Sequence, residues 1–189
     1  MNNFITSSRL TVSSLVICSV LYPAVILGFA MVAAPKSRQG SLIRNDAGEI
    51  IGSRLIAQSF TQPGYFWPRP SAVDYDASAT GGSNLSPTNP ALTERAEAGI
   101  AKLNLKSDQK VPADLVAASG SGMDPHISLA SAKLQAERVA AARGLSLSTV
   151  DSLIQDNLEG QALVVLGGDP IVNVLTLNMA VDQTLAEKE

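Results

Sequence analysis

The residue types that could do hydrolytic chemistry lie together in the segment from Val111 to Ser128, which reads VPADLVAASGSGMDPHIS. Ser121, His126 and Asp124 are the residue types of a nucleophile, a base and an orienting acid. Three residues so close together in one glycine-rich turn cannot easily be brought into line, and no G-x-S-x-G sequence surrounds Ser121. The sequence therefore argues against a catalytic triad. We expect Asp124 and Ser128 to cap turns or helix starts, and His126 to form a structural hydrogen bond.

Metal and disulfide chemistry are restricted by composition. His126 is the only histidine, so a site with several histidine ligands is excluded. Cys18 is the only cysteine, which excludes an internal disulfide and a cysteine zinc site. The formal net charge is −3, so the chain has no basic footprint for nucleic acid.

Two further segments are candidates for binding. Tyr65, Phe66 and Trp67 are adjacent and lie between prolines, and we expect them to form a core nucleus; direct contact with a ligand is the alternative. The segment from Asp76 to Pro90 is a loop by composition, in which Gly81 and Gly82 are expected to supply positive φ and could form a backbone nest for an anion or a partner. A nucleotide cradle is not supported, because no P-loop Lys-Ser/Thr follows.

These segments follow a long apolar run from Leu10 to Ala34. The run contains no Asp, Glu, Lys, Arg or His. A helix of about 25 residues is longer than a bilayer core is thick. Arg9 precedes it and Lys36 and Arg38 follow it, where a helix would emerge into the headgroups. We predict one membrane-spanning helix, because the later sequence is too polar to span.

A cleaved signal peptide is the competing interpretation. The apolar run exceeds the length usual for a signal h-region, Pro35 would directly follow the cut, and Arg9 is the only basic side chain before the run. A retained anchor is therefore favoured. The basic residues on its two sides leave the orientation ambiguous and slightly favour a cytoplasmic carboxyl-terminal side.

The expected layout is a tail at 1–9, a transmembrane helix at 10–34, a stalk at 35–50 and a soluble domain at 51–189. A turn at Asn45 to Gly48 is predicted to join two short extended segments. Gly52 to Gln58 is predicted to form a strand or a short helix. Asn89 and Pro90 are typical of a helix start, so a helix is expected over Ala91 to Leu105.

The carboxyl-terminal half is predicted to contain two helices and a strand. The first helix runs from Leu129 to Arg143 and ends at Gly144, and Ser148 is expected to cap a second that runs to about Leu158. Ile171 to Asn178 alternates apolar and polar residues, which favours a strand. The fold class is therefore α+β or α/β, with a small sheet covered by helices.

Several blocks of sequence, in fixed order, resemble one known family. They are a single N-terminal span, GSRLIAQSFTQPGYFWPRPSA, GGSNLSPTNPAL, VPADLVAASGSGMDPHIS, QAERVAAARGL and VNVLTLNMAVD. Together they are similar to the C subunits of the Kdp potassium-transporting P-type ATPases, over essentially the whole chain. One departure is the apolar segment GQALVVLGGDPIVNV, where more charge would be expected.

The resemblance implies a noncatalytic subunit of an ATP-driven, high-affinity potassium uptake complex. The implied partners are a channel-like potassium-binding subunit and a P-type ATP-hydrolysing subunit, with a further small single-span subunit as an additional candidate, besides membrane lipid. The chain itself has no Asp-Lys-Thr-Gly phosphorylation motif and no TVGYG-like filter. No cofactor is therefore expected on this chain alone, and ATP and potassium would act at the complex.

The family also implies a location and a way of acting. The amino terminus would be cytoplasmic, the span would lie in the inner membrane, and the soluble domain would be extracytoplasmic. Members are described as raising the ATP affinity of the catalytic subunit. If both statements hold, the effect must pass through the complex as a conformational coupling, because an outer domain cannot touch cytoplasmic ATP.

Seven residues are expected to form the partner-facing surface or to hold the fold together: Tyr65, Phe66, Arg69, Asn84, Asn89, Asp124 and His126. Two alternatives from other classes of function remain open at this point. One is a membrane-anchored extracytoplasmic hydrolase that uses Ser121 or His126. The other is an anion- or solute-binding module built on the loop at Gly81 and Gly82.

Overall fold

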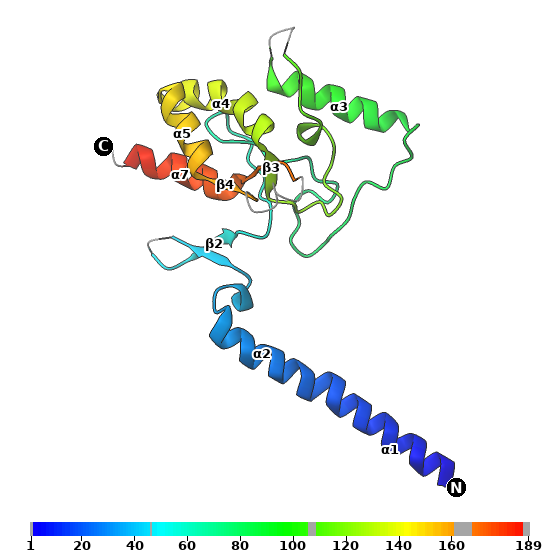
Figure 1. Cartoon of the computed structure of the whole chain (residues 1–189). Helices are drawn as coiled ribbons and strands as arrows, with labels where there is room; N and C mark the ends of the chain where they lie inside the picture. Colours follow the sequence, from blue (N-terminus) through cyan, green and yellow to red (C-terminus); the bar gives the residue numbers. More distant parts are fainter. Residues whose placement is uncertain (1, 46, 106–108, 161–167, 187–189) are drawn as a thin grey trace. The chain divides into compact units, whose positions relative to one another are not determined.

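A computed structural model describes residues 2–45, 47–105, 109–160 and 168–186. By backbone contacts the chain divides into two compact units, residues 1–53 and residues 54–189. The first unit begins with one continuous helix made of α1 (Asn2–Val16), η1 (Ile17–Leu21) and α2 (Tyr22–Ala33) (Figure 1). Within the described residues, Asn3–Ala33 is the one helix long and apolar enough to cross a membrane.

Pro23 is accommodated inside this helix by a change of helical pitch. Proline has no N–H to donate and its ring crowds the preceding turn. The turn before it, η1, is a π-helix, and the N–H of Tyr22 donates to the carbonyl of Ile17, five residues back. Such a π-bulge lets the helix continue past the proline.

A short hairpin completes the first unit. The turn η2 (Ser37–Gln39) leads into β1 (Leu42–Arg44), which pairs antiparallel with β2 (Ile50–Ser53) through an irregular register. The Gly48 N–H donates to the Asn45 carbonyl at 2.9 Å. The two extended segments joined by a turn are thus as predicted, although Asp46 lies outside the described residues.

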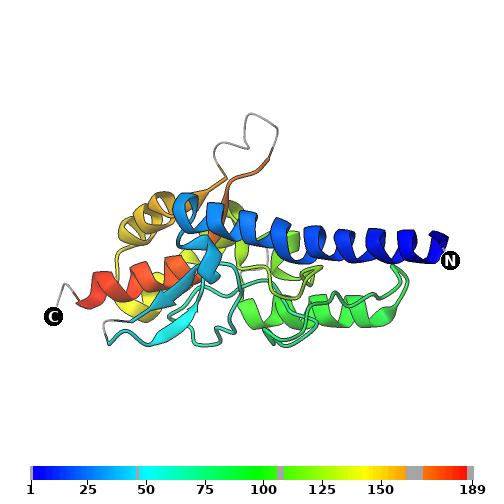
Figure 2. The ribbon, with the colours of Figure 1, turned by 90° about the horizontal axis from the view of Figure 1, so that it is seen from below.

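The second unit is an α+β domain, which confirms the predicted fold class (Figures 1 and 2). Three strands form an antiparallel sheet in the order β3–β5–β4, with β3 at His126–Ser128, β5 at Ile171–Asn173 and β4 at Leu158–Glu159. The helices α4 (Leu129–Arg143) and α7 (Val174–Ala186) pack against this sheet, and α5 (Leu147–Asp156) packs against both of them.

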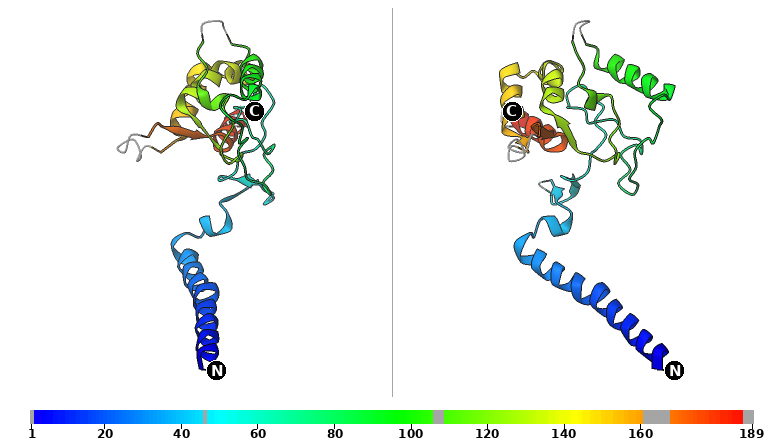
Figure 3. Two further views of the ribbon diagram at one scale, coloured as in Figure 1. Left: turned by 90° about the vertical axis from the view of Figure 1, so that its right-hand side faces the viewer. Right: turned by 45° about the vertical axis from the view of Figure 1, so that its right-hand side comes forward.

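The other helical elements among the described residues of this unit lie on the far side of the domain from α5 and α7 (Figures 1 and 3). They are α3 (Pro90–Leu103) and the short turn η3 (Ala113–Leu115). As predicted, Asn89 caps α3, because its side chain accepts a hydrogen bond from the Ala91 N–H. The helix ends at Leu103, two residues earlier than predicted, where Asn104 adopts a left-handed conformation.

The core lies where α4, α5, α7 and the sheet meet. Its largest fully buried apolar side chains come from all of these elements and from residues 65–67, here called the aromatic segment: Phe66, Ile127, Val139, Val150, Ile154, Val172, Val174, Leu177 and Val181. Alanines on α4 allow close approach of the helices, because Ala132 and Ala136 are also buried.

Three predictions of local structure were wrong. The strand predicted over Ile171 to Asn178 ends at Asn173, whose side chain accepts from the Thr176 N–H and so starts α7. Ser146, not Ser148, caps α5. Of the segment from Gly52 to Gln58, only its first two residues are extended in β2. In the first case a buried asparagine side chain outweighed the alternating pattern, because it satisfies a free helix N–H.

Candidate functional site

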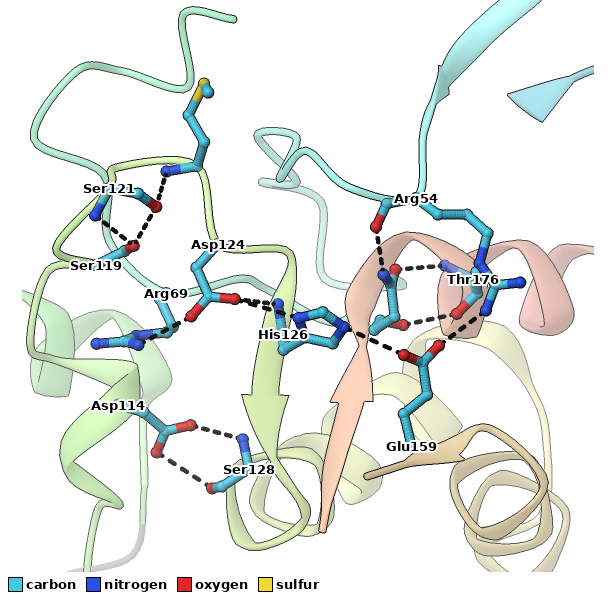
Figure 4. Close-up of polar contacts among 12 residues, drawn as sticks. Arg54, Arg69, Asp114, Ser119, Ser121, Asp124, His126, Ser128, Glu159 and Thr176 are labelled. Atoms are coloured by element: carbon cyan, nitrogen blue, oxygen red, sulfur yellow. Dashed lines mark hydrogen bonds and ion pairs between the residues drawn. The ribbon is translucent and has the colours of Figure 1, made fainter. Parts of the chain in front are cut away.

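A chain of charged side chains crosses the sheet of the second unit (Figure 4). His126 lies on the edge strand β3, and Glu159 lies on β4 at the opposite edge. Asp124 precedes β3, while Arg54 and Arg69 come from the irregular segments before α3. The sheet therefore brings together groups that are far apart in sequence.

The contacts in this chain are successive ion pairs. Arg69 Nη1 donates to Asp124 Oδ2 at 3.0 Å, and His126 Nδ1 lies 3.3 Å from Asp124 Oδ1. His126 Nε2 lies 3.3 Å from Glu159 Oε2, and Arg54 Nη2 donates to Glu159 Oε1 at 2.9 Å. Both ring nitrogens of His126 thus face a carboxylate, which suits the doubly protonated imidazolium.

The pKa values of the central pair follow from these contacts. The hydrogen bond to Asp124, followed by that to Glu159, raises the pKa of His126 against the opposing effect of burial. The hydrogen bond from His126 lowers the pKa of Asp124, with smaller contributions from the His126 N–H and from Arg69. The charged forms of both groups therefore stabilise each other.

Asp114 forms a second polar cluster beside the first. It accepts from the Ser128 N–H at 2.7 Å and from the Ser131 hydroxyl at 2.6 Å. Ser128 in turn caps α4 by accepting from the Ser131 N–H. Asp124 similarly accepts from the His126 N–H at 3.0 Å, so carboxylates take up two outward N–H groups of the edge strand β3. This capping protects the edge from pairing with another strand.

An open cavity of about 890 Å³ lies beside these two clusters. Its polar side contains Arg69, Asp114, Asp124 and His126, which are paired with each other or with the backbone, and also the charged residues Lys133 and Asp169. Its apolar side contains Ile127, Leu129 and Ile171. Among the described residues no group of His, Cys, Asp and Glu is arranged to hold a metal ion.

The aromatic segment is fixed by amide side chains rather than by a strand. Gln135 on α4 accepts from the Trp67 N–H at 2.8 Å and donates to the Trp67 carbonyl at 3.1 Å. Asn178 on α7 makes the same pair of hydrogen bonds with Phe66. Phe66 is fully buried, so its side chain supports the fold, as the core interpretation of this segment predicts.

Two arginines complete the support of this segment. Arg138 donates to the carbonyls of Pro63 and Tyr65 and lies 3.7 Å from the centre of the Trp67 ring. Burial lowers its pKa to about 10, so it remains charged. Arg143 donates to the Gly64 carbonyl at 2.8 Å and stacks on Tyr65. The segment is therefore held rigidly against α4.

The seven residues singled out from sequence fall into three places. Arg69, Asp124 and His126 meet in the charge chain, and Tyr65 and Phe66 lie in the aromatic segment. Asn89 caps α3, and Asn84 is an exposed loop residue with a φ of 50°. The structure does not bring all seven onto one surface. As expected, His126 and Asp124 form structural hydrogen bonds, and Ser128 caps a helix.

Sequence reasoning missed several residues of these clusters. Glu159, Arg54 and Asp114 complete the polar contacts, and Gln135 and Asn178 hold the aromatic segment. Gln135 gave a usable signal, because it is a long polar side chain within an alanine-rich helix. The others gave none, since their partners are distant in sequence.

The geometry also bears on the two alternative sites. Ser121 bonds to Ser119 and to the Met123 N–H, whereas both ring nitrogens of His126 face carboxylates, so no nucleophile and base are paired here (Figure 4). The expectation of positive φ at Gly81 and Gly82 was wrong, since neither is in the left-handed region. The Gly81 N–H donates to the Ser121 carbonyl at 2.8 Å and is unavailable to an anion.

These features fit the class of single-span membrane subunits that carry one α+β domain. The family model described as "K+-transporting ATPase, c chain" matches residues 4–183. The chain therefore belongs to the KdpC family of potassium-transporting ATPase subunits.

Individual relatives agree over almost the full length. A potassium-transporting ATPase KdpC subunit of Parvibaculum lavamentivorans is 46% identical over 183 residues, which is 97% of each chain. The protein of the same name from Synechocystis is 46% identical over 187 residues, 95% of this chain and 97% of the relative. That of Bacillus anthracis is 41% identical over 181 residues, 94% and 93% of the two chains.

Proposed function

We propose that this chain is a noncatalytic accessory subunit of the ATP-driven potassium uptake complex, needed for its assembly and stability. The observation that carries the proposal is the family match over residues 4–183, which includes both the apolar helix and the soluble domain. Its partners in the proposal are the channel-like potassium-binding subunit and the P-type ATP-hydrolysing subunit, with a small single-span subunit as a further candidate.

The soluble domain supports this proposal through the pairing of its polar groups. The charge chain from Arg69 to Glu159 consists of groups that bind each other, and Asp114 is occupied by Ser128 and Ser131. Side chains whose polar groups are hydrogen-bonded to one another make the surface rigid, and they are not free to attack a substrate. This is the behaviour expected of a rigid docking domain.

We place the amino terminus in the cytoplasm and the domain outside the inner membrane. In that topology the domain cannot reach cytoplasmic ATP. An increase in the ATP affinity of the catalytic subunit would then be a coupling between conformational states of the complex. In the proposal ATP and potassium act at the complex, because this chain has neither the Asp-Lys-Thr-Gly phosphorylation motif nor a TVGYG-like filter.

Co-purification tests the accessory role. The chain, tagged at its carboxyl terminus, is extracted in mild detergent from cells that express the whole complex. The proposal expects a P-type ATPase and a large channel-like subunit to be recovered with potassium-stimulated ATPase activity. Untagged cells are the control. Recovery of the chain alone, from cells shown to contain both partners, would contradict the proposal.

Cysteine labelling tests the topology. Cys18 is the only cysteine and is removed as Cys18→Ser, and a new cysteine is placed at the exposed residue Gln183 on α7. A membrane-impermeant maleimide should label Gln183→Cys in intact spheroplasts. The matched variant with cysteine at Ser7, before the apolar run, should be labelled only after lysis. The reverse pattern would place the domain in the cytoplasm.

A further inference from the structure

A second cavity, of about 350 Å³, lies between α3 and the aromatic segment, and Pro68 and Pro70, the neighbours of Arg69 in sequence, belong to its lining. Its walls include the rings of Phe60, Trp67 and Tyr75 and the ring of Pro68. Arg95 and Lys102 line it from α3. The cavity thus combines aromatic walls with two cationic groups.

Among the described residues no carboxylate lines this cavity, but one acts on its lining, since Asp74 adds to the effect of burial in raising the pKa of Tyr75. The Tyr75 hydroxyl donates to the Arg69 carbonyl at 2.8 Å, and burial raises the pKa of this phenol, so it stays neutral. Lys102 Nζ lies 4.6 Å from the centre of the Trp67 ring. A chain whose formal net charge is −3 therefore has a locally positive cavity.

Among the described residues two buried side-chain donors lack a partner, Arg69 Nε in the charge chain and, in this cavity, a donor of Arg95. Its Nε atom is inaccessible to solvent and has no hydrogen-bond acceptor among the described residues. Helix neighbours that could pair with it lie three or four positions away, and these are Ala91, Leu92, Ala98 and Gly99, none of them acidic. A buried donor left unpaired is unfavourable, so an acceptor supplied from outside would be favoured.

The ligand chemistry follows from these groups. A guanidinium binds a carboxylate through two parallel hydrogen bonds, and the ammonium of Lys102 adds a second positive charge. The aromatic and proline walls suit an apolar side chain next to that carboxylate. The volume accommodates one or two side chains and is at the low end for ligand pockets.

We propose that this cavity receives an acidic side chain of a partner subunit, Asp or Glu, together with an adjacent apolar side chain. The choice of a partner subunit as the source rests on the accessory function proposed above. A free organic carboxylate has the same chemistry and is the source that the experiment must distinguish.

Trp67 makes binding directly observable, because it is the only tryptophan and it lines the cavity. The full-length chain in detergent is titrated with the capped dipeptide N-acetyl-Glu-Phe-amide while its fluorescence is followed. N-acetyl-Gln-Phe-amide is the neutral control peptide, and N-acetylglutamate tests a carboxylate without the apolar neighbour. We expect the affinity to be highest for the first peptide.

Three variants assign the binding to Arg95. Arg95→Gln should lower the affinity for the acidic peptide at least about tenfold, as expected for the loss of a hydrogen bond to a charged group. Arg95→Lys should restore part of that affinity. Lys110→Gln removes an exposed positive charge outside the cavity and should leave the affinity unchanged. Equal binding of both peptides, or an unchanged affinity in Arg95→Gln, would overturn the proposal.

Co-purification identifies the source of the carboxylate. Wild-type chain and Arg95→Glu are compared at increasing salt, and both are first shown to unfold at similar temperatures. We expect the Arg95→Glu variant to lose the partner subunits at lower salt, because two carboxylates would then oppose each other. Retention equal to wild type would overturn the proposal. Failure of wild type itself to retain partners would instead contradict the accessory function, while the peptide titration would still test the cavity.

Discussion

Asn178 and Phe66 are 112 residues apart in the chain, yet the side chain of one pairs with the backbone of the other. The Phe66 N–H donates to Asn178 Oδ1 at 2.8 Å, and Asn178 Nδ2 donates to the Phe66 carbonyl at 3.0 Å. Gln135 does the same for Trp67. Two buried amides therefore supply what a neighbouring strand would otherwise supply, and the aromatic segment can enter the core without a sheet partner.

Replacing Asn178 by alanine should destabilise the domain by about 2–4 kcal/mol, because two buried backbone groups of Phe66 lose their partners. Urea unfolding of the full chain in detergent, followed by Trp67 fluorescence, measures this change. Gln183→Ala, an exposed position on the same helix, is the control and should change stability by less than about 0.5 kcal/mol. Similar midpoints for the two variants would contradict the role of Asn178.

Gly122→Ala should be more destabilising than Gly144→Ala, although both glycines have positive φ, 71° and 63°. A Cβ at residue 122 would lie 2.5 Å from Val73 Cγ2 and 2.8 Å from the Gly81 carbonyl oxygen, whereas at residue 144 nothing lies within 4 Å. We expect a loss of about 1 kcal/mol at Gly144 and roughly 1–3 kcal/mol more at Gly122. The difference between the two midpoints isolates the steric effect, and equal losses would rule it out.

The charge chain should make stability depend on pH through His126. Its pKa is raised in the folded state, so its contribution is fully present below its ordinary value of 6.5 and is lost as pH rises through the raised pKa. Asp124 has a lowered pKa, so its contribution is present above 3.8 and is lost as pH falls through the lowered value.

We therefore expect the free energy of unfolding of the wild type to fall as the pH rises above about 6.5 and through the raised pKa of His126. His126→Asn should remove that part of the slope, and Glu159→Gln should reduce it. Urea unfolding at several pH values measures the free energy of unfolding of each variant. Lys133→Gln, at an exposed position, is the control for a change of charge. An unaltered slope in His126→Asn would show that other groups cause the dependence.

Asp114→Asn should cost about 1–3 kcal/mol, because an amide presents a donor to the N–H and hydroxyl groups that now bind carboxylate oxygens. The loss of negative charge at the start of α4 acts in the same direction. Thermal unfolding of the full chain measures the effect, with Glu97→Gln on the exposed face of α3 as the control. Equal transition temperatures for the two variants would contradict this account of the Asp114 cluster.

Local signals were sufficient for several elements. The length and composition of the apolar run predicted a long apolar helix, which the structure contains. Asn89 and Ser128 began helices and Gly144 ended one as predicted, because capping acts between residues close in sequence. The α+β fold class followed from the same kind of signal. Where a local pattern failed, at Asn173, a buried side chain made a hydrogen bond that the alternation of residues did not reveal.

The tertiary structure alone decided which side chains meet. His126 could be recognised as chemically distinctive, but its partner Glu159 lies 33 positions later and reaches it only because β3 and β4 flank β5. The pairing of Phe66 with Asn178 and the unpaired Arg95 likewise depend on contacts between distant elements. Spacing along a chain fixes neighbours within a helix or turn, whereas contacts across a core are set by how whole elements pack.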